Sequence, residues 1–287
     1  SASKYVQESI DNCVAYLAQN FGGQKLSKRV TATWPYEYDA EMDVTPELSA
    51  DLATYFQSEI SVLCWMVELG RVDMITEVSI LASQLALPRE GHLDAVFHIF
   101  AYLKSHHNAC ICFDPTYANI DLSVFQEHDW KHFYGDVKEA IPLDAPSPHG
   151  KEVELRMFVD SDHAGDKRTR QSRTGFFIFL NSALIQWVSK KQPTIETSVF
   201  GAEFVAMKHG METLHGLRYK LHMMGVPLSG LSYIYGDNMS VIHNTQHPDS
   251  TLKEKSNSIC YHAIRESVAM GESLTGHIST GENPADL

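Results

Sequence analysis

The sequence predicts an α/β domain preceded by an all-α unit. In the first hundred residues, apolar side chains recur every three or four positions, as they do on amphipathic helices. From residue 151 onward, short β-type runs alternate with helical segments, an order typical of one compact α/β domain. Hydrophobic residues make up 44% of the 287-residue chain and charged residues 21%, values typical of a globular protein.

The first part, residues 1–113, is expected to contain four helices. They are predicted near 3–20, 51–69 and 73–87, and from Pro88 to about residue 107. The polar residues 22–45 are expected to form an extended connector, and Cys110–Phe113 a short buried strand. Residues 114–150 mix acids with prolines and carry little periodicity, which predicts a linker or an irregular crossing segment.

The second part, residues 151–287, is expected to contain five strands and three helices. The strands are predicted at 153–160, 175–180, 183–189, 231–235 and 273–278, and the helices at 200–224, 238–244 and 255–270.

The net charge of −13 disfavours a general nucleic-acid-binding protein, but the charge is unevenly distributed. Residues 1–150 hold 9 Lys and Arg against 21 Asp and Glu, whereas residues 151–287 hold 14 against 15.

No apolar run approaches the roughly 18–20 residues of a membrane span, so no membrane partner is expected. The five cysteines show no disulfide framework, which favours a reducing compartment.

Four acids of the second part lie at positions that are unusual for ordinary solvent-exposed charges. Asp160 and Asp237 end two predicted strands, and the carboxyl ends of strands form the edge at which α/β sheets bind ligands. Glu203 shares the apolar stripe of the long helix, where a carboxylate needs a neighbouring cation or proton. Asp286 follows the last strand. The alternatives are turn caps for Asp160 and Asp237 and a boundary acid for Glu203.

Short motifs follow one another along both parts of the chain. In the second part they are VDSDHAGD at 159–166, RTGF at 173–176, WVSKKQ at 187–192, GAEF at 201–204, YGDN at 235–238, YHAIRE at 261–266 and ENPAD at 282–286. With these motifs, residues 151–287 resemble the ribonuclease H domain of Ty1/copia-type retrotransposon polyproteins. Residues 1–113 are similar to the thumb or connection of the reverse transcriptase just upstream, through SKYV at 3–6, ELGRVD at 68–73 and PREGHL at 88–93.

The resemblance implies a ribonuclease H-like mixed sheet with flanking helices and a catalytic set of four carboxylates. Asp160, Glu203, Asp237 and Asp286 match the family's catalytic and metal-binding acids one by one. They would bind two Mg²⁺ ions, for which Mn²⁺ can substitute, with Asp160 bridging both. Asp162 and Asp166 compete with Asp160 for the first position, and Asp160 is preferred because the family match places it at the strand end. His277 lies nine residues before Asp286 but is not assigned the product-release role of a histidine found in many ribonucleases H.

A run of six basic residues without an acid extends from Lys167 to Lys191. Such a run is usually a solvated face, but beside four acids it predicts contacts to phosphates of a nucleic acid. Asn238, directly after Asp237, is a candidate donor to an RNA 2′-hydroxyl. The predicted nucleic-acid-binding residues are Arg168, Arg170, Arg173, Lys190, Lys191 and Asn238.

The function implied by the resemblance is Mg²⁺-dependent endonucleolytic hydrolysis of the RNA strand of RNA–DNA hybrids within a retrotransposon reverse transcriptase. The expected partners are the hybrid, the missing palm and fingers, and other parts of the polyprotein. Because the sequence lacks a Tyr-x-Asp-Asp motif, this chain is not expected to polymerise DNA. The alternatives are a non-catalytic hybrid-binding fragment and a DNA-directed nuclease or transposase on the same fold. The expected location is a cytoplasmic virus-like particle, with the nucleus as a second candidate compartment.

Overall fold

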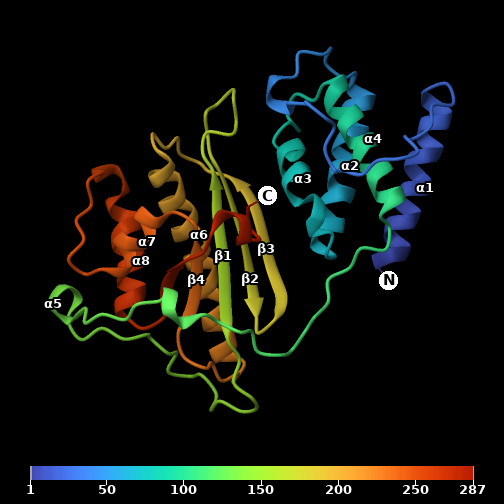
Figure 1. Ribbon diagram of the computed structural model, residues 1–287. Coiled ribbons are helices and arrows are strands. Elements are labelled where there is room, and N and C mark those ends of the chain that lie inside the picture. Colours follow the sequence, from blue (N-terminus) through green and yellow to red (C-terminus); the bar gives the residue numbers. More distant parts are fainter. Residues whose placement is uncertain (1, 287) are drawn as a thin grey trace. The chain divides into compact units, whose positions relative to one another are not determined.

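The computed structural model describes residues 2–286 and divides into two compact units, Ser1–Ile111 and Cys112–Leu287 (Figure 1). Each unit is described separately below. None of the helices described in these residues is long and apolar enough to cross a membrane.

The first unit is all-α, as predicted. Its helices are α1 (Ala2–Asn20), α2 (Ala50–Glu68), α3 (Ile75–Ala82) and α4 (Glu90–Ser105). Large side chains from all four helices are fully buried, among them Ile10, Phe56, Leu81 and Phe100. Helix α3 is shorter than predicted because a 3₁₀ turn (Val72–Met74) precedes it and because turns follow it. After its end the Ser83 hydroxyl donates to the Ser79 carbonyl at 3.0 Å, and such side-chain bonds compete with the helix.

The expected strand at Cys110–Phe113 is wrong. These residues lie outside regular structure, and Cys110, Cys112 and Phe113 are exposed. An apolar run of four residues forms a strand only where another strand can pair with its backbone, and none pairs with it here.

The second unit contains the predicted mixed five-stranded sheet. Its strands are β1 (Leu155–Asp162), β2 (Arg173–Leu180), β3 (Ala183–Lys191), β4 (Ser232–Gly236) and β5 (Ser273–His277). The spatial order is β3-β2-β1-β4-β5. The first three strands pair antiparallel as two consecutive hairpins, whereas β4 and β5 join parallel to β1. This order confirms the predicted ribonuclease H-like fold class.

The sheet is flanked by the helices α6 (Val199–Met223), α7 (Met239–Gln246) and α8 (Ser258–Ala269) (Figure 1). Helix α6 packs against β1 and β2 through a core that includes Val159, Phe176 and Phe204. Gly210 allows a close approach of helix and sheet, because a Cβ atom there would lie 2.6 Å from the Met157 sulfur. Helix α6 therefore packs closely against β1.

Residues 112–150 belong to the second unit, although they form little regular structure beyond a 3₁₀ turn (Leu122–Val124) and the short α5 (Lys131–Tyr134). Phe125 bridges to Gly276 of β5, and its ring occupies the space that a side chain at Gly276 would need. Trp130 is buried and lies 4.8 Å from the guanidinium of Arg265. Both aromatic residues belong to a second core, together with Phe158 and Tyr235.

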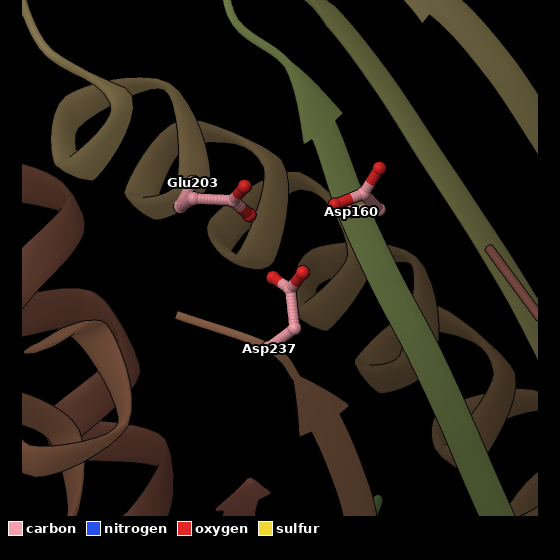
Figure 2. A group of neighbouring side chains, drawn as sticks. All are labelled: Asp160, Glu203 and Asp237. Carbon is pink, nitrogen blue, oxygen red and sulfur yellow. The ribbon is translucent and has the colours of Figure 1, made fainter. Parts of the chain in front are cut away.

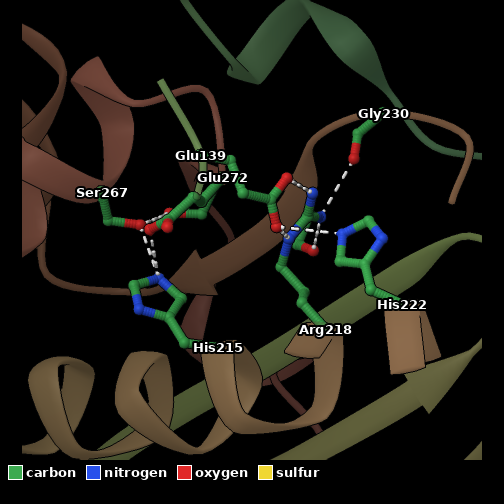
Figure 3. A network of polar contacts seen from close by, with 9 residues as sticks. Glu139, His215, Arg218, His222, Gly230, Ser267 and Glu272 are labelled. Carbon is green, nitrogen blue, oxygen red and sulfur yellow. Dashed lines mark hydrogen bonds and ion pairs between the residues drawn. The ribbon is translucent and has the colours of Figure 1, made fainter. Parts of the chain in front are cut away.

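A partly buried ion pair attaches the same segment to α6 (Figure 3). Arg218 donates to both carboxylate oxygens of Glu139, at 2.8 and 2.6 Å, and also to the Gly230 carbonyl and the Ser232 hydroxyl. Burial alone would raise the pKa of the Glu139 carboxyl, but Arg218 and His222 beside it lower that pKa overall. The Glu139 carboxylate is therefore held as an anion against the sheet domain.

Candidate active site

Three acids from separate elements meet at one edge of the sheet (Figure 2). Asp160 comes from β1, Glu203 from α6, and Asp237 from the residue that follows β4. One carboxylate oxygen of each acid lies within 4.8 Å of the others. Among the described residues, this is the group of three or more His, Cys, Asp or Glu that could hold a metal ion.

The fold explains why these three side chains converge. Strands β1 and β4 are parallel neighbours, so their carboxyl ends meet at the same edge, although β1 continues two residues past Asp160. Helix α6 begins at this edge, where the Ser198 hydroxyl accepts from the Gly201 amide at 3.0 Å. Glu203 lies in the first turns of the helix, and only 6% of it is exposed.

A buried glutamine links the strands to the helix next to Glu203. The Gln192 amide nitrogen donates to the Ala202 carbonyl at 2.9 Å and to the Thr174 hydroxyl at 3.0 Å. It therefore ties the end of β3 to β2 and to the backbone beside Glu203. Gln192 ends the WVSKKQ motif, but the motif alone does not predict this role.

Burial and mutual repulsion raise the pKa values of two acids of the cluster. The pKa of Glu203 is raised to about 8, first by burial and then by the charges of Asp160 and Asp237, with Ser161 partly offsetting the rise. The pKa of Asp160 is raised to about 6 by burial and by Asp237, with smaller contributions from Asp286 and Asp162. The cluster therefore favours a bound proton or cation.

The donor set fits divalent cations that prefer oxygen ligands. All three groups are carboxylates, the ligands by which Mg²⁺ is usually bound, and no His or Cys belongs to the group. A metal ion between them would also relieve the repulsion that raises the pKa values. The residues present therefore suit the Mg²⁺ ions expected from the sequence.

Asp286, the fourth predicted acid, lies outside the group of three. Its side chain is exposed, and its charge contributes to the raised pKa of Asp160. Its backbone amide donates to the Asn283 carbonyl at 3.1 Å.

The two acids that compete with Asp160 in the sequence lie outside the cluster. Asp162 is exposed at the end of β1. Asp166 is buried, forms an ion pair with Lys191, and accepts from the backbone amides of Arg168 and Thr169. Although burial opposes ionisation, these partners lower the pKa of Asp166 to about 2.

The predicted nucleic-acid-binding residues have different surroundings. Arg168, Arg170 and Lys190 are exposed, whereas Arg173 is buried and Lys191 contacts Asp166. The Asn238 side chain caps α7 by accepting from the amides of the first turn, at 3.1 and 3.3 Å. Three of the six side chains thus lie at the surface, and the other three are buried or partly buried.

The residues after β5 contact Asp237. The Thr280 hydroxyl donates to the Asp237 carboxylate at 2.8 Å, and the His277 Nε2 atom lies 3.2 Å from the Asp237 carbonyl oxygen. No sequence motif marks Thr280, which begins a short 3₁₀ turn (Thr280–Glu282).

Comparison with known proteins agrees with the sequence motifs. Over 267 residues, 93% of the chain, the protein is 26% identical to the retrovirus-related Pol polyprotein from transposon TNT 1-94 of Nicotiana tabacum. The chain is a distant homologue of Ty1/copia-type Pol polyproteins. It is also 30% identical over 180 residues to the Pol polyprotein from transposon RE2 of Arabidopsis thaliana. It spans only 17% and 12% of these two Pol polyproteins.

Two ribonucleases H are among the solved structures similar to part of this chain. RNase H1 from Halobacterium salinarum aligns with a TM-score of 0.36 and 12% identity, over 46% of this chain and 90% of that chain. LC11-RNase H1, solved in complex with an RNA/DNA hybrid, aligns with a TM-score of 0.35 and 15% identity. The alignment covers 46% of this chain and 89% of that chain. No protein-family model matches the chain.

Proposed function

We propose that this chain hydrolyses the RNA strand of RNA–DNA hybrids with Mg²⁺, as part of a retrotransposon reverse transcriptase. The observation that carries the proposal is the convergence of Asp160, Glu203 and Asp237 at one edge of a sheet with the ribonuclease H-like strand order. Homology to Pol polyproteins supports the same class of substrate. The LC11-RNase H1 crystal contained an RNA/DNA hybrid.

Hydrolysis of a phosphodiester needs an activated water and stabilisation of the leaving oxygen. Two bound divalent ions supply both effects in enzymes of this chemistry. Asp160, Glu203 and Asp237 would hold them, with Asp160 as the shared ligand and Asp286 completing the set. The buried position of Glu203 limits competing water, which strengthens the electrostatic effect of every charge in the site.

The basic surface near the site would bind the hybrid backbone. Arg168, Arg170 and Lys190 are exposed and suited to phosphate contacts. Contacts to phosphates position a nucleic acid but do not select RNA. Selection of the RNA strand requires a contact to its 2′-hydroxyls, for which Asn238 is the proposed donor.

The test is cleavage of a labelled RNA strand in a hybrid, with Mg²⁺, by wild type and by Asp160→Asn. Wild type should cut the hybrid and leave duplex DNA intact, and Asp160→Asn should not cut. The matched control is Asp162→Asn, two residues further on the same face of β1 but outside the cluster, which should retain cleavage.

A hybrid-binding chain without nuclease activity is the second candidate, and the position of Asp286 outside the group of three acids favours it. In that case, wild type and Asp160→Asn would both bind the hybrid and neither would cut it. Cleavage of duplex DNA would instead indicate a DNA-directed nuclease.

A further inference from the structure

The segment that follows β5 returns to the strands that carry the acidic cluster. At its start, the Ile278 amide donates to the Gly236 carbonyl at 3.1 Å, immediately before Asp237. Further on, the buried side chain of Asn283 donates from Nδ2 to the Val159 carbonyl at 3.1 Å, immediately before Asp160. The segment is therefore bonded to both strands at the residues that precede their acids.

The same asparagine also shapes the turn that leads to Asp286. Its Oδ1 atom accepts from the Ala285 amide at 3.1 Å, and its carbonyl accepts from the Asp286 amide at 3.1 Å. One side chain thus uses its donor for β1 and its acceptor for the turn. An uncharged amide side chain can serve both partners at once, because its donor and its acceptor are separate atoms.

A glycine in β2 leaves room for this turn. Gly175 pairs directly with Asp160 in the sheet, and a Cβ atom at Gly175 would lie 3.3 Å from the Ala285 carbonyl oxygen. Ala285 itself is 2% exposed. The turn is therefore packed against the two strands at the position of Asp160, while the Asp286 side chain that follows it is exposed.

We propose that Asn283 is a positioning residue that anchors Asp286 beside Asp160, so that Asp286 contributes to binding of divalent ions. This inference rests on the proposed function, because it assumes that the acidic cluster binds such ions. Without the bond to Val159, the turn that leads to Asp286 would lose this side-chain hydrogen bond to β1. Asp286 would then spend less time near the cluster, and the affinity for the ions would fall.

The experiment is isothermal titration of the full chain with Mn²⁺, for wild type, Asn283→Ala, Asp286→Asn and the double variant. We expect Asn283→Ala to weaken binding by about 10-fold or more, the size typical of residues that orient a metal ligand. In the Asp286→Asn background, the same substitution should change the affinity less than twofold, because the residue acts through Asp286. A purely structural role would give the same loss in both backgrounds.

Two further variants separate this effect from general destabilisation. Asn181→Ala also removes two side-chain bonds to backbone atoms, those to Glu154 and Pro115, but at the opposite end of β1. It should lower the melting temperature without altering the Mn²⁺ affinity. Asn283→Ser retains an acceptor for the turn but cannot reach Val159, so it should weaken Mn²⁺ binding while folding normally.

Unchanged Mn²⁺ affinity in both Asn283 variants, or an equal loss with and without Asp286, would overturn the inference while leaving the proposed function intact. Wild-type protein that binds no Mn²⁺ would overturn the proposed function and this inference with it.

Discussion

The Gln192 side chain donates to the carbonyl of Ala202 at 2.9 Å, one residue before Glu203. Through this bond, the end of β3 holds the first turns of α6 against the sheet. Gln192 is 2% exposed, so water cannot replace the bond when it is lost.

Replacing Gln192 with Leu should therefore destabilise the fold and weaken metal binding together. The expected loss in unfolding free energy is about 1–3 kcal/mol, because the buried Ala202 carbonyl loses the side-chain donor. Urea unfolding and Mn²⁺ titration measure the two effects. The matched control is Gln246→Leu, which also removes two bonds of a buried glutamine, to Val124 and Thr275, but leaves the cluster alone. If both variants alter Mn²⁺ affinity equally, Gln192 has no special role in the site.

Glu203 should make the metal-free protein less stable as the pH rises. Its pKa is about 8 in the folded protein and 4.5 ordinarily, so the unfolded chain releases the proton at lower pH. The contribution of Glu203 to stability is therefore fully present below about pH 4.5 and is lost progressively as the pH rises to about 8. The loss is on the order of a few kcal/mol, since one pKa unit corresponds to about 1.4 kcal/mol.

Glu203→Gln should remove most of this pH dependence and raise the melting temperature in EDTA at pH 8. Saturating Mg²⁺ should stabilise wild type more than the variant, because the ion binds the folded state and offsets the repulsion. Parallel pH profiles of wild type and Glu203→Gln in thermal melts would contradict the raised pKa.

Breaking the ion pair between Glu139 and Arg218 should destabilise the sheet domain. Glu139→Gln leaves the 3%-exposed Arg218 without its counter-charge, at an expected cost of about 3 kcal/mol in urea unfolding. The exposed pair of Lys131 and Asp136 provides the control, because Asp136→Asn should cost less than about 1 kcal/mol. Equal, small effects would mean that the pair of Glu139 and Arg218 contributes little to the stability of the second unit.

Charge reversal at Arg168, Arg170 and Lys190 should weaken binding of an RNA–DNA hybrid without unfolding the domain. Each lost phosphate contact should reduce the slope of log affinity against log salt by about 0.7–0.9. Fluorescence anisotropy at several salt concentrations gives the slope. Lys220→Glu, in the last turn of α6 and far along the helix from Glu203, is the control and should leave the slope unchanged. Equal slopes for the triple variant and wild type would indicate that the basic run is a solvated face without contacts to phosphates.

The regular elements were predictable because their residues repeat with the period of the helix or the strand. Apolar side chains at intervals of three or four marked α6, and they placed Glu203 on its buried face. Asp160 and Asp237 were recognisable because each follows a short apolar run in a parallel pair of strands. The convergence of these three acids thus follows from local patterns and strand order.

The contacts made by irregular segments were not predictable in the same way. The bond from Asn283 to Val159 joins residues 124 positions apart, and no periodicity connects them. Likewise, residues 112–150 pack through single aromatic side chains, such as Phe125 and Trp130, separated by polar residues. Their sequence therefore resembles a linker, and their burial depends on partners in β4, β5 and α8 that only the folded chain brings together.

The most direct test of the proposed metal centre is anomalous diffraction from crystals soaked in Mn²⁺. The account predicts two anomalous peaks among the carboxylates of Asp160, Glu203 and Asp237, with Asp160 contacting both ions. The peaks should disappear in crystals of Asp160→Asn soaked in the same way. Wild-type crystals that diffract well after soaking but show no peak at these three carboxylates would contradict the central claim.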